Sequence, residues 1–168
     1  VDGVSGATLT SLAIVESIRN RLPPQGSESD AAARSASLKF PSPPRMQDVQ
    51  LLFAAADSIA FDPQQDVWNV WNSDRELVGH IRRTSPAADN VVGYQGPTET
   101  LIGLDSGGQT TGIAVGASYD NEPYVDYVRT DKYFRKLFNG QSLAELAAID
   151  LQTAGIEGVS GATMTSQA

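Results

Sequence analysis

The sequence predicts an α+β domain, an antiparallel β-sheet with helices packed on one side, preceded by an N-terminal helix and a Pro/Ser-rich linker. Two observations predict this class. Strand-like segments joined by short turns occupy residues 66–118, where we expect four to six strands. From residue 122 onward the apolar residues instead follow helical spacing. The 168 residues fit one ordinary domain.

The N-terminal segment, residues 1–22, predicts a turn of small residues followed by a helix. Pro23-Pro24 ends a run of apolar residues at helical spacing, namely Leu12, Val15, Ile18 and Leu22. Exposing such a stripe costs a few kcal/mol, so we expect residues 10–22 to pack on the main domain or on a neighbouring chain, including by domain swapping. Residues 23–44 are rich in Pro, Ser and Ala and are predicted to be a linker.

The main domain is predicted to cover residues 45–168 and to begin with a short helix in MQDVQLLFAAAD. Four residues of that helix share one apolar face: Val49, Leu52, Phe53 and Ala56. The segments VWNVWNS and ELVGHIRRTS alternate as strands, with Asn72-Ser73-Asp74 as the turn between them. The clearest strands are residues 101–104 and 110–115, which a turn at 105–108 joins into a second hairpin.

Two helices are expected after the second hairpin, at about residues 122–138 and 142–149, with Asn139-Gly140 as the break. Ser142 and Glu145 form a capping box at the start of the second helix. Before the same hairpin, Gly93 and Gly96 indicate a place where the backbone bends or approaches another group closely.

Composition excludes several classes of function. The net charge of −8 argues against nucleic acid or an anionic membrane surface as a partner. The chain has no cysteine, which excludes iron–sulfur, thiolate–metal and cysteine-nucleophile chemistry within it, and His80 is its one histidine, so no metal site is expected. No apolar run approaches the roughly 20 residues of a membrane span. The sequence opens in mid-motif without Met, so we interpret it as a piece of a longer protein.

One ten-residue phrase occurs twice, at residues 2–11 and 157–166, and the copies match at eight of ten positions. Small residues that lead into a helix expose backbone N–H groups at the positive end of the helix dipole, which favours an anion. In the second copy, Gly161 and Ala162 leave room for a phosphate beside three hydroxyls, those of Ser160, Thr163 and Thr165. There is no P-loop lysine, so the pattern predicts a phosphate-bearing ligand other than a nucleoside triphosphate.

The phrase SGATxTS resembles the motif of the FMN-binding domain family, which occurs in the sodium-pumping NADH:quinone reductase and in the Rnf electron-transport complex. GYQGP resembles that family's Gly-Tyr-x-Gly-Pro segment, and SYDNEPYV with the residues after it looks closest to the membrane-bound regulators of nitrous-oxide reductase expression. Two departures are present: Glu157 replaces the family's Asp, and residues 118–123 replace its His-x-Glu-Thr-Pro stretch.

The resemblance implies FMN as cofactor, joined by a flavin transferase as a phosphoester to Thr163 in the main domain and to Thr8 in the first copy. The other residues implied in cofactor binding are Ser160, Gly161, Ala162 and Thr165 in the second copy, Ser5, Gly6 and Ala7 in the first, and Gly93, Tyr94, Gly96 and Pro97 in the loop. Two copies imply two tandem flavin domains, with residues 1–22 as the tail of the first.

The resemblance further implies an electron-transfer module of a membrane-associated redox or regulatory protein. It would lie on the extracytoplasmic (periplasmic) side of the membrane and exchange electrons with other redox domains or subunits, without catalytic turnover of its own. The alternative is a flavin-free sensory or interaction domain that keeps the motif structurally. Trp68 and Trp71 are either a flavin-stacking pair or, as is commoner, part of the sheet packing, and His80 is expected to be a strand residue.

Overall fold

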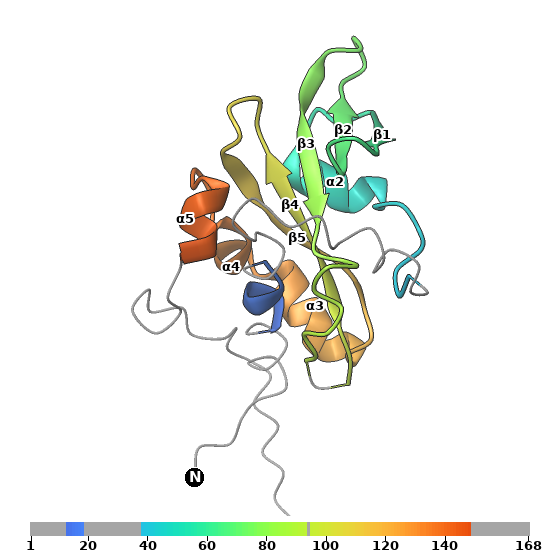
Figure 1. The fold of residues 1–168 in the computed structure, drawn as a ribbon, viewed down its shortest axis with the longest axis vertical. Helices are drawn as coiled ribbons and strands as arrows, with labels where there is room; N and C mark the ends of the chain where they lie inside the picture. Colours follow the sequence, from blue (N-terminus) through green and yellow to red (C-terminus); the bar gives the residue numbers. More distant parts are fainter. Residues whose placement is uncertain (1–12, 19–37, 94, 149–168) are drawn as a thin grey trace, which may run out of the picture.

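Five strands form one antiparallel sheet in the computed structural model, which describes residues 13–18, 38–93 and 95–148 (Figure 1). The strands lie in sequence order: β1 (Ser58–Asp62), β2 (Val67–Trp71), β3 (Leu77–Arg83), β4 (Thr98–Leu104) and β5 (Thr110–Ser118). The named helices are α2 (Met46–Leu52), α3 (Glu122–Thr130), α4 (Lys132–Lys136) and α5 (Leu143–Ala148). The predicted α+β class is confirmed.

Both predicted hairpins are present. Each turn has a side chain whose oxygen accepts hydrogen bonds from the backbone N–H groups of that turn. Asn72 Oδ1 accepts two backbone N–H bonds in the β2–β3 turn, at 3.0 and 2.8 Å. Asp105 Oδ1 does the same in the β4–β5 turn, from Gly107 N at 2.8 Å and Gln109 N at 2.9 Å. The sheet begins earlier than expected, since β1 was not predicted and pairs with β2 along the exposed edge.

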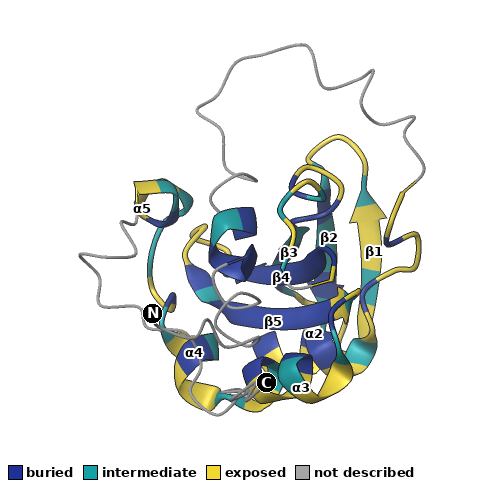
Figure 2. Ribbon diagram, turned by 90° about the horizontal axis from the view of Figure 1, so that it is seen from below, coloured by how far each residue is buried: buried dark blue, intermediate teal, exposed yellow. Residues whose placement is uncertain are grey.

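The helices cover both faces of the sheet, so the expectation that they pack on one side is wrong in this respect. Neighbouring residues of a strand point to opposite faces. Leu101 packs with α2, and its neighbour Ile102 packs with α3, α4 and α5. The cluster on the α2 face contains the four residues predicted for that helix face, Val49, Leu52, Phe53 and Ala56, together with Val70, Ile81, Leu101 and Ala114. Figure 2 shows β4 and β5 as the most deeply buried strands.

The region predicted as one helix over residues 122–138 is two helices. Asp131 separates them, because its carboxylate accepts a hydrogen bond from Phe134 N at 2.9 Å and thereby caps α4. The capping box of the next helix is confirmed. Ser142 Oγ accepts from Glu145 N at 3.2 Å, and Glu145 accepts from Ser142 N at 2.7 Å, which lowers the pKa of the Glu145 carboxyl.

Residues 13–18 form a helical segment that is buried in the main domain, as the apolar stripe predicted. Ile14 is 0% exposed, and Val15 and Ile18 are 1% exposed. They belong to the same core cluster as Ile102 of β4 and residues of β5, α3, α4 and α5. Figure 1 shows this segment (blue) beside α3 and α4. The rest of the predicted helix lies outside the described residues.

Candidate functional site

The glycine-rich loop before β4 is a tight turn at the end of the sheet. Gly93 N donates to Gly96 O at 2.9 Å, which closes the turn. Gly96 and Pro97 pack against the residues that follow β5, and Pro97 O accepts from Tyr119 N at 3.1 Å. The segment Gly93–Pro97, called here the glycine loop, is therefore held against the turn after β5.

Asp120 is the main partner of the glycine loop. Its Oδ1 accepts two backbone hydrogen bonds, from Gln95 N at 2.6 Å and from Gly96 N at 3.1 Å. Asp120 N in turn donates to Ser118 Oγ at 3.0 Å, and Ser118 Oγ is 2.6 Å from Thr98 Oγ1 on β4. These contacts tie the turn after β5 to the start of β4.

The two glycines of this loop are needed for close approach, as the sequence predicted. A Cβ on Gly93 would overlap the Asp120 carboxylate, and a Cβ on Gly96 would overlap Tyr119 Cβ. Neither glycine has a positive φ, so the requirement is space rather than backbone conformation.

Gly96→Ala should lower the free energy of unfolding by about 1–3 kcal/mol, because the new methyl group would have to displace the turn at Tyr119. Gly107→Ala is the matched control in the β4–β5 turn, where the added Cβ would meet only the Asp105 side chain, at 3.2 Å from Oδ1. It should change stability by less than about 0.5 kcal/mol. Urea denaturation measures both, and equal effects would contradict the close-approach interpretation.

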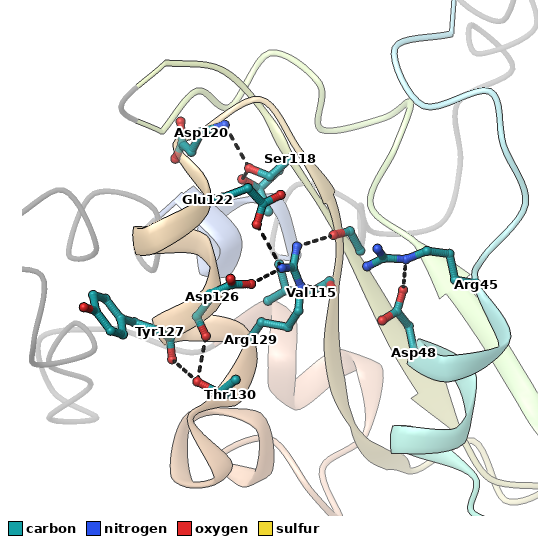
Figure 3. A network of polar contacts seen from close by, with 12 residues as sticks. Arg45, Asp48, Val115, Ser118, Asp120, Glu122, Asp126, Tyr127, Arg129 and Thr130 are labelled. Atoms are coloured by element: carbon teal, nitrogen blue, oxygen red, sulfur yellow. Dashed lines mark hydrogen bonds and ion pairs between the residues drawn. The ribbon is translucent and has the colours of Figure 1, made fainter.

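Helix α3 begins directly after this turn and is fastened to β5 by Arg129 (Figure 3). Arg129 Nη2 donates to Gly116 O at 3.2 Å, and Arg129 Nε donates to Val115 O at 3.4 Å. The same guanidinium forms ion pairs with Glu122, at 3.2 Å, and with Asp126. The turn that carries Asp120 is therefore fixed on both sides, by β5 before it and by α3 after it.

A buried ion pair lies on the neighbouring part of the sheet. Arg83 of β3 pairs with Glu99 of β4, whose side chain is 5% exposed. Burial raises the pKa of the Glu99 carboxyl, and the positive charge of Arg83 opposes this rise. Arg83 Nη2 also donates to Phe40 O at 2.9 Å, and the Phe40 ring contacts Tyr119 edge-on at 5.5 Å. Part of the predicted linker thus packs on the domain beside the glycine loop.

The raised pKa of Glu99 gives stability a predictable pH dependence. Above pH 4.5, its ordinary value, the unfolded chain ionises this carboxyl more readily than the folded one, so its stabilising contribution falls as pH rises through the folded pKa. The difference in unfolding free energy between wild type and Glu99→Gln should therefore decrease as pH rises from about 4 to about 7. Urea denaturation across that range tests this, and a difference that grows with pH would contradict it.

Among the described residues, the buried hydroxyl of Thr100 on β4 has no hydrogen-bond partner. Thr100 is 0% exposed. A buried hydroxyl left unpaired costs roughly 1–3 kcal/mol. A ligand atom that accepted or donated a hydrogen bond here would remove that cost.

The structure places three of the predicted site residues. Gly93, Gly96 and Pro97 come together in the glycine loop, whereas their neighbour Tyr94 lies outside the described residues. Both copies of the repeated phrase also lie outside, with all the residues predicted there: Ser5, Gly6, Ala7, Thr8, Ser160, Gly161, Ala162, Thr163 and Thr165.

The other aromatic and histidine candidates belong to the sheet. Trp68 packs against the α2-side core, with the ring of Phe61 at 5.3 Å, as the packing interpretation predicted. His80 Nδ1 is 2.7 Å from Asn69 Oδ1 on the adjacent strand. In the described ranges, no group of three metal-ligating side chains is close enough to hold an ion. Within those ranges, too, no helix has the length and apolar character needed to cross a bilayer.

Asp120, Ser118 and Thr100 were not predicted as site residues, and neither was the backbone N–H of Gln95. The one usable signal was that residues 118–123 depart from the family's pattern and bring in an aspartate. Nothing in the sequence linked that aspartate to a loop 25 residues earlier.

The described part of the chain is an α+β domain whose antiparallel sheet carries the glycine loop, held by Asp120, before β4. The comparison with protein families names the cofactor. Residues 93–168 match the FMN-binding domain, and this match supports FMN as the cofactor of the region that it covers. No curated protein and no solved structure matches the chain.

Proposed function

We propose that the protein is an electron-transfer module in which FMN is linked as a phosphoester to Thr163. The observation that carries the proposal is the extent of the family match: residues 93–168 begin at the glycine loop and include the second copy of the repeated phrase. Bound FMN supplies electron transfer, and the chain supplies position and electrostatic environment. The Thr100 hydroxyl on β4, which has no hydrogen-bond partner among the described residues, is available to a polar group of the cofactor.

In this proposal one set of residues binds the phosphate end of FMN and another set contacts the rest of the flavin. Ser160, Gly161 and Ala162 shape the turn that receives the phosphate, and the Thr163 hydroxyl bears it. Attachment requires a flavin transferase and FAD: the Thr163 oxygen bonds to the FMN phosphorus, the bond to AMP breaks, and the hydroxyl proton passes to solvent. The glycine loop, with Thr100, is the candidate contact for the rest of the flavin.

The cellular setting extends the same proposal. We place the module on the extracytoplasmic side of a membrane-associated redox or regulatory protein, similar to the regulators of nitrous-oxide reductase expression. Its partners are then a flavin transferase and further redox domains or subunits. The support for this setting is the resemblance of the region from residue 118 to 166.

Coexpression of the full chain with a flavin transferase tests the function. The expected product is yellow, and its flavin stays with the protein after acid precipitation. Purified protein should accept and return electrons in a spectroscopic titration, with no turnover of small substrates. Protein that neither acquires flavin under these conditions nor binds added FMN would instead support the flavin-free sensory or interaction domain.

A further inference from the structure

The glycine loop has two adjacent backbone N–H groups, and a side chain of the same protein accepts hydrogen bonds from both. Gln95 N and Gly96 N both donate to one oxygen, Asp120 Oδ1. Such a pair of N–H groups is a small anion-binding site. Since a carboxylate already occupies it, the phosphate of FMN has to be held elsewhere, and the loop conformation depends on an internal anion.

The fit between the carboxylate and the loop is tight. Asp120 is 6% exposed, and its second oxygen, Oδ2, lies where a side chain on Gly93 would begin. Hydrogen bonds from N–H groups to an ionised carboxylate are roughly twice as strong as neutral ones. Asp120 therefore fixes the distance between the loop and the turn after β5.

Two contacts that do not involve the Asp120 side chain also join β4 to the end of β5. Thr98 Oγ1 and Ser118 Oγ join β4 to β5 at 2.6 Å, and Pro97 O accepts from Tyr119 N. Neither contact involves the Asp120 side chain. Removing that side chain takes away the two N–H bonds within the loop, and so acts on the loop conformation.

We propose that Asp120 is a positioning residue of the FMN site. It holds the glycine loop in the shape that receives the flavin, without contacting the flavin itself. This inference rests on the proposed function, because it takes the loop to be part of the cofactor site. It assigns a role to a residue in the stretch where this chain departs from the family's pattern.

Two substitutions of Asp120 separate the effect of its acceptor oxygens from the effect of its charge. Asp120→Ala removes the acceptor, whereas Asp120→Asn keeps one oxygen in place without the charge. Asp105→Ala is the matched control, because Asp105 Oδ1 also accepts two backbone N–H bonds, but at the other end of the same strand pair. Ser118→Ala removes the bond from Asp120 N and the Thr98 contact, and leaves the two bonds from the loop to Asp120 in place.

The measurement is the binding of free FMN to the unmodified full chain, followed by flavin fluorescence, with thermal unfolding recorded for every variant. We expect Asp120→Ala to weaken FMN binding at least about tenfold, and Ser118→Ala and Asp120→Asn, which keeps an acceptor without the charge, to weaken it less. Asp105→Ala should bind FMN like wild type, even if its unfolding temperature falls as much as that of Asp120→Ala. Added acetate should restore part of the binding to Asp120→Ala alone, because it can occupy the vacated N–H pair.

Two failures are distinguishable. Wild-type protein that binds no FMN overturns the proposed function and this inference with it. FMN binding that is equal in wild type and Asp120→Ala, or that falls equally in Asp120→Ala and Asp105→Ala, overturns only the positioning role. If Asp120→Ala does not fold, Ser118→Ala and Asp120→Asn decide the matter, and an affinity in Ser118→Ala equal to wild type counts against the role.

Discussion

Ile14→Asp should unfold most of the protein at about 25 °C, although residue 14 lies far outside the segment that matches the FMN-binding domain. The Ile14 side chain is 0% exposed and packs in one cluster with β4, β5, α3, α4 and α5. An aspartate there would be an unpaired charge in an apolar core, which costs several kcal/mol even after its pKa has shifted. Domains of this size are stable by only about 5–15 kcal/mol.

Leu51→Asp is the matched control, because Leu51 lies on α2 and is 49% exposed. It introduces the same charge on another helix and should cost less than about 1 kcal/mol. Ile14→Val, which removes one methylene, should cost about 0.5–1.5 kcal/mol. Far-UV circular dichroism and urea denaturation measure all three variants. If Ile14→Asp unfolds at the same urea concentration as wild type, residues 13–18 do not stabilise this domain.

This result would change how the repeat is interpreted. The first copy was expected to be the tail of a preceding flavin domain, and that division of the chain remains a prediction. The structure adds that residues 13–18, which follow the first copy in the sequence, pack in one core cluster with β4, β5, α3, α4 and α5. Residues 13–18 are therefore part of this domain's folding unit, whichever domain they descend from.

The sequence predicted those features that depend on neighbours along the chain. Both hairpins were predicted because their turns hold Asn72 and Asp105, whose side chains satisfy the turn backbone locally. The apolar face of α2 and the capping box at Ser142 were predicted from spacing alone. The break at Asp131 was missed because a cap inside a continuous helical pattern changes no periodicity.

Features that depend on distant partners were not predicted. Leu101 and Ile102 lie on opposite faces, but the sequence does not say that helices cover each face. A carboxylate that accepts from backbone N–H groups leaves no periodic pattern, so Asp120 could not be assigned to the glycine loop. The glycines themselves were found because only a missing side chain permits such an approach. In this site the sequence thus indicated where contact occurs, and the structure identified the partner.

Thr163→Ala should abolish acid-stable flavin on the second copy of the phrase, because an alanine has no oxygen on which a phosphoester can form. Coexpression with a flavin transferase, acid precipitation and mass spectrometry of tryptic peptides measure this. The two copies separate cleanly, since trypsin releases them in peptides of residues 1–19 and 137–168. Flavin on the first peptide, at Thr8, should be unaffected by the change at Thr163.

The neighbouring hydroxyls are the controls for this experiment. Thr165→Ala and Ser166→Ala should keep the modification of the second peptide, because neither oxygen occupies the position that bears the phosphate. Ser160→Ala should reduce loading without eliminating it, since Ser160 shapes the turn. Glu157→Asp restores the shorter carboxylate of the first copy, Asp2, and should raise loading if that residue limits recognition by the transferase. Flavin that persists on the second peptide of Thr163→Ala, or that maps to Thr165 or Ser166, would overturn the assignment of Thr163.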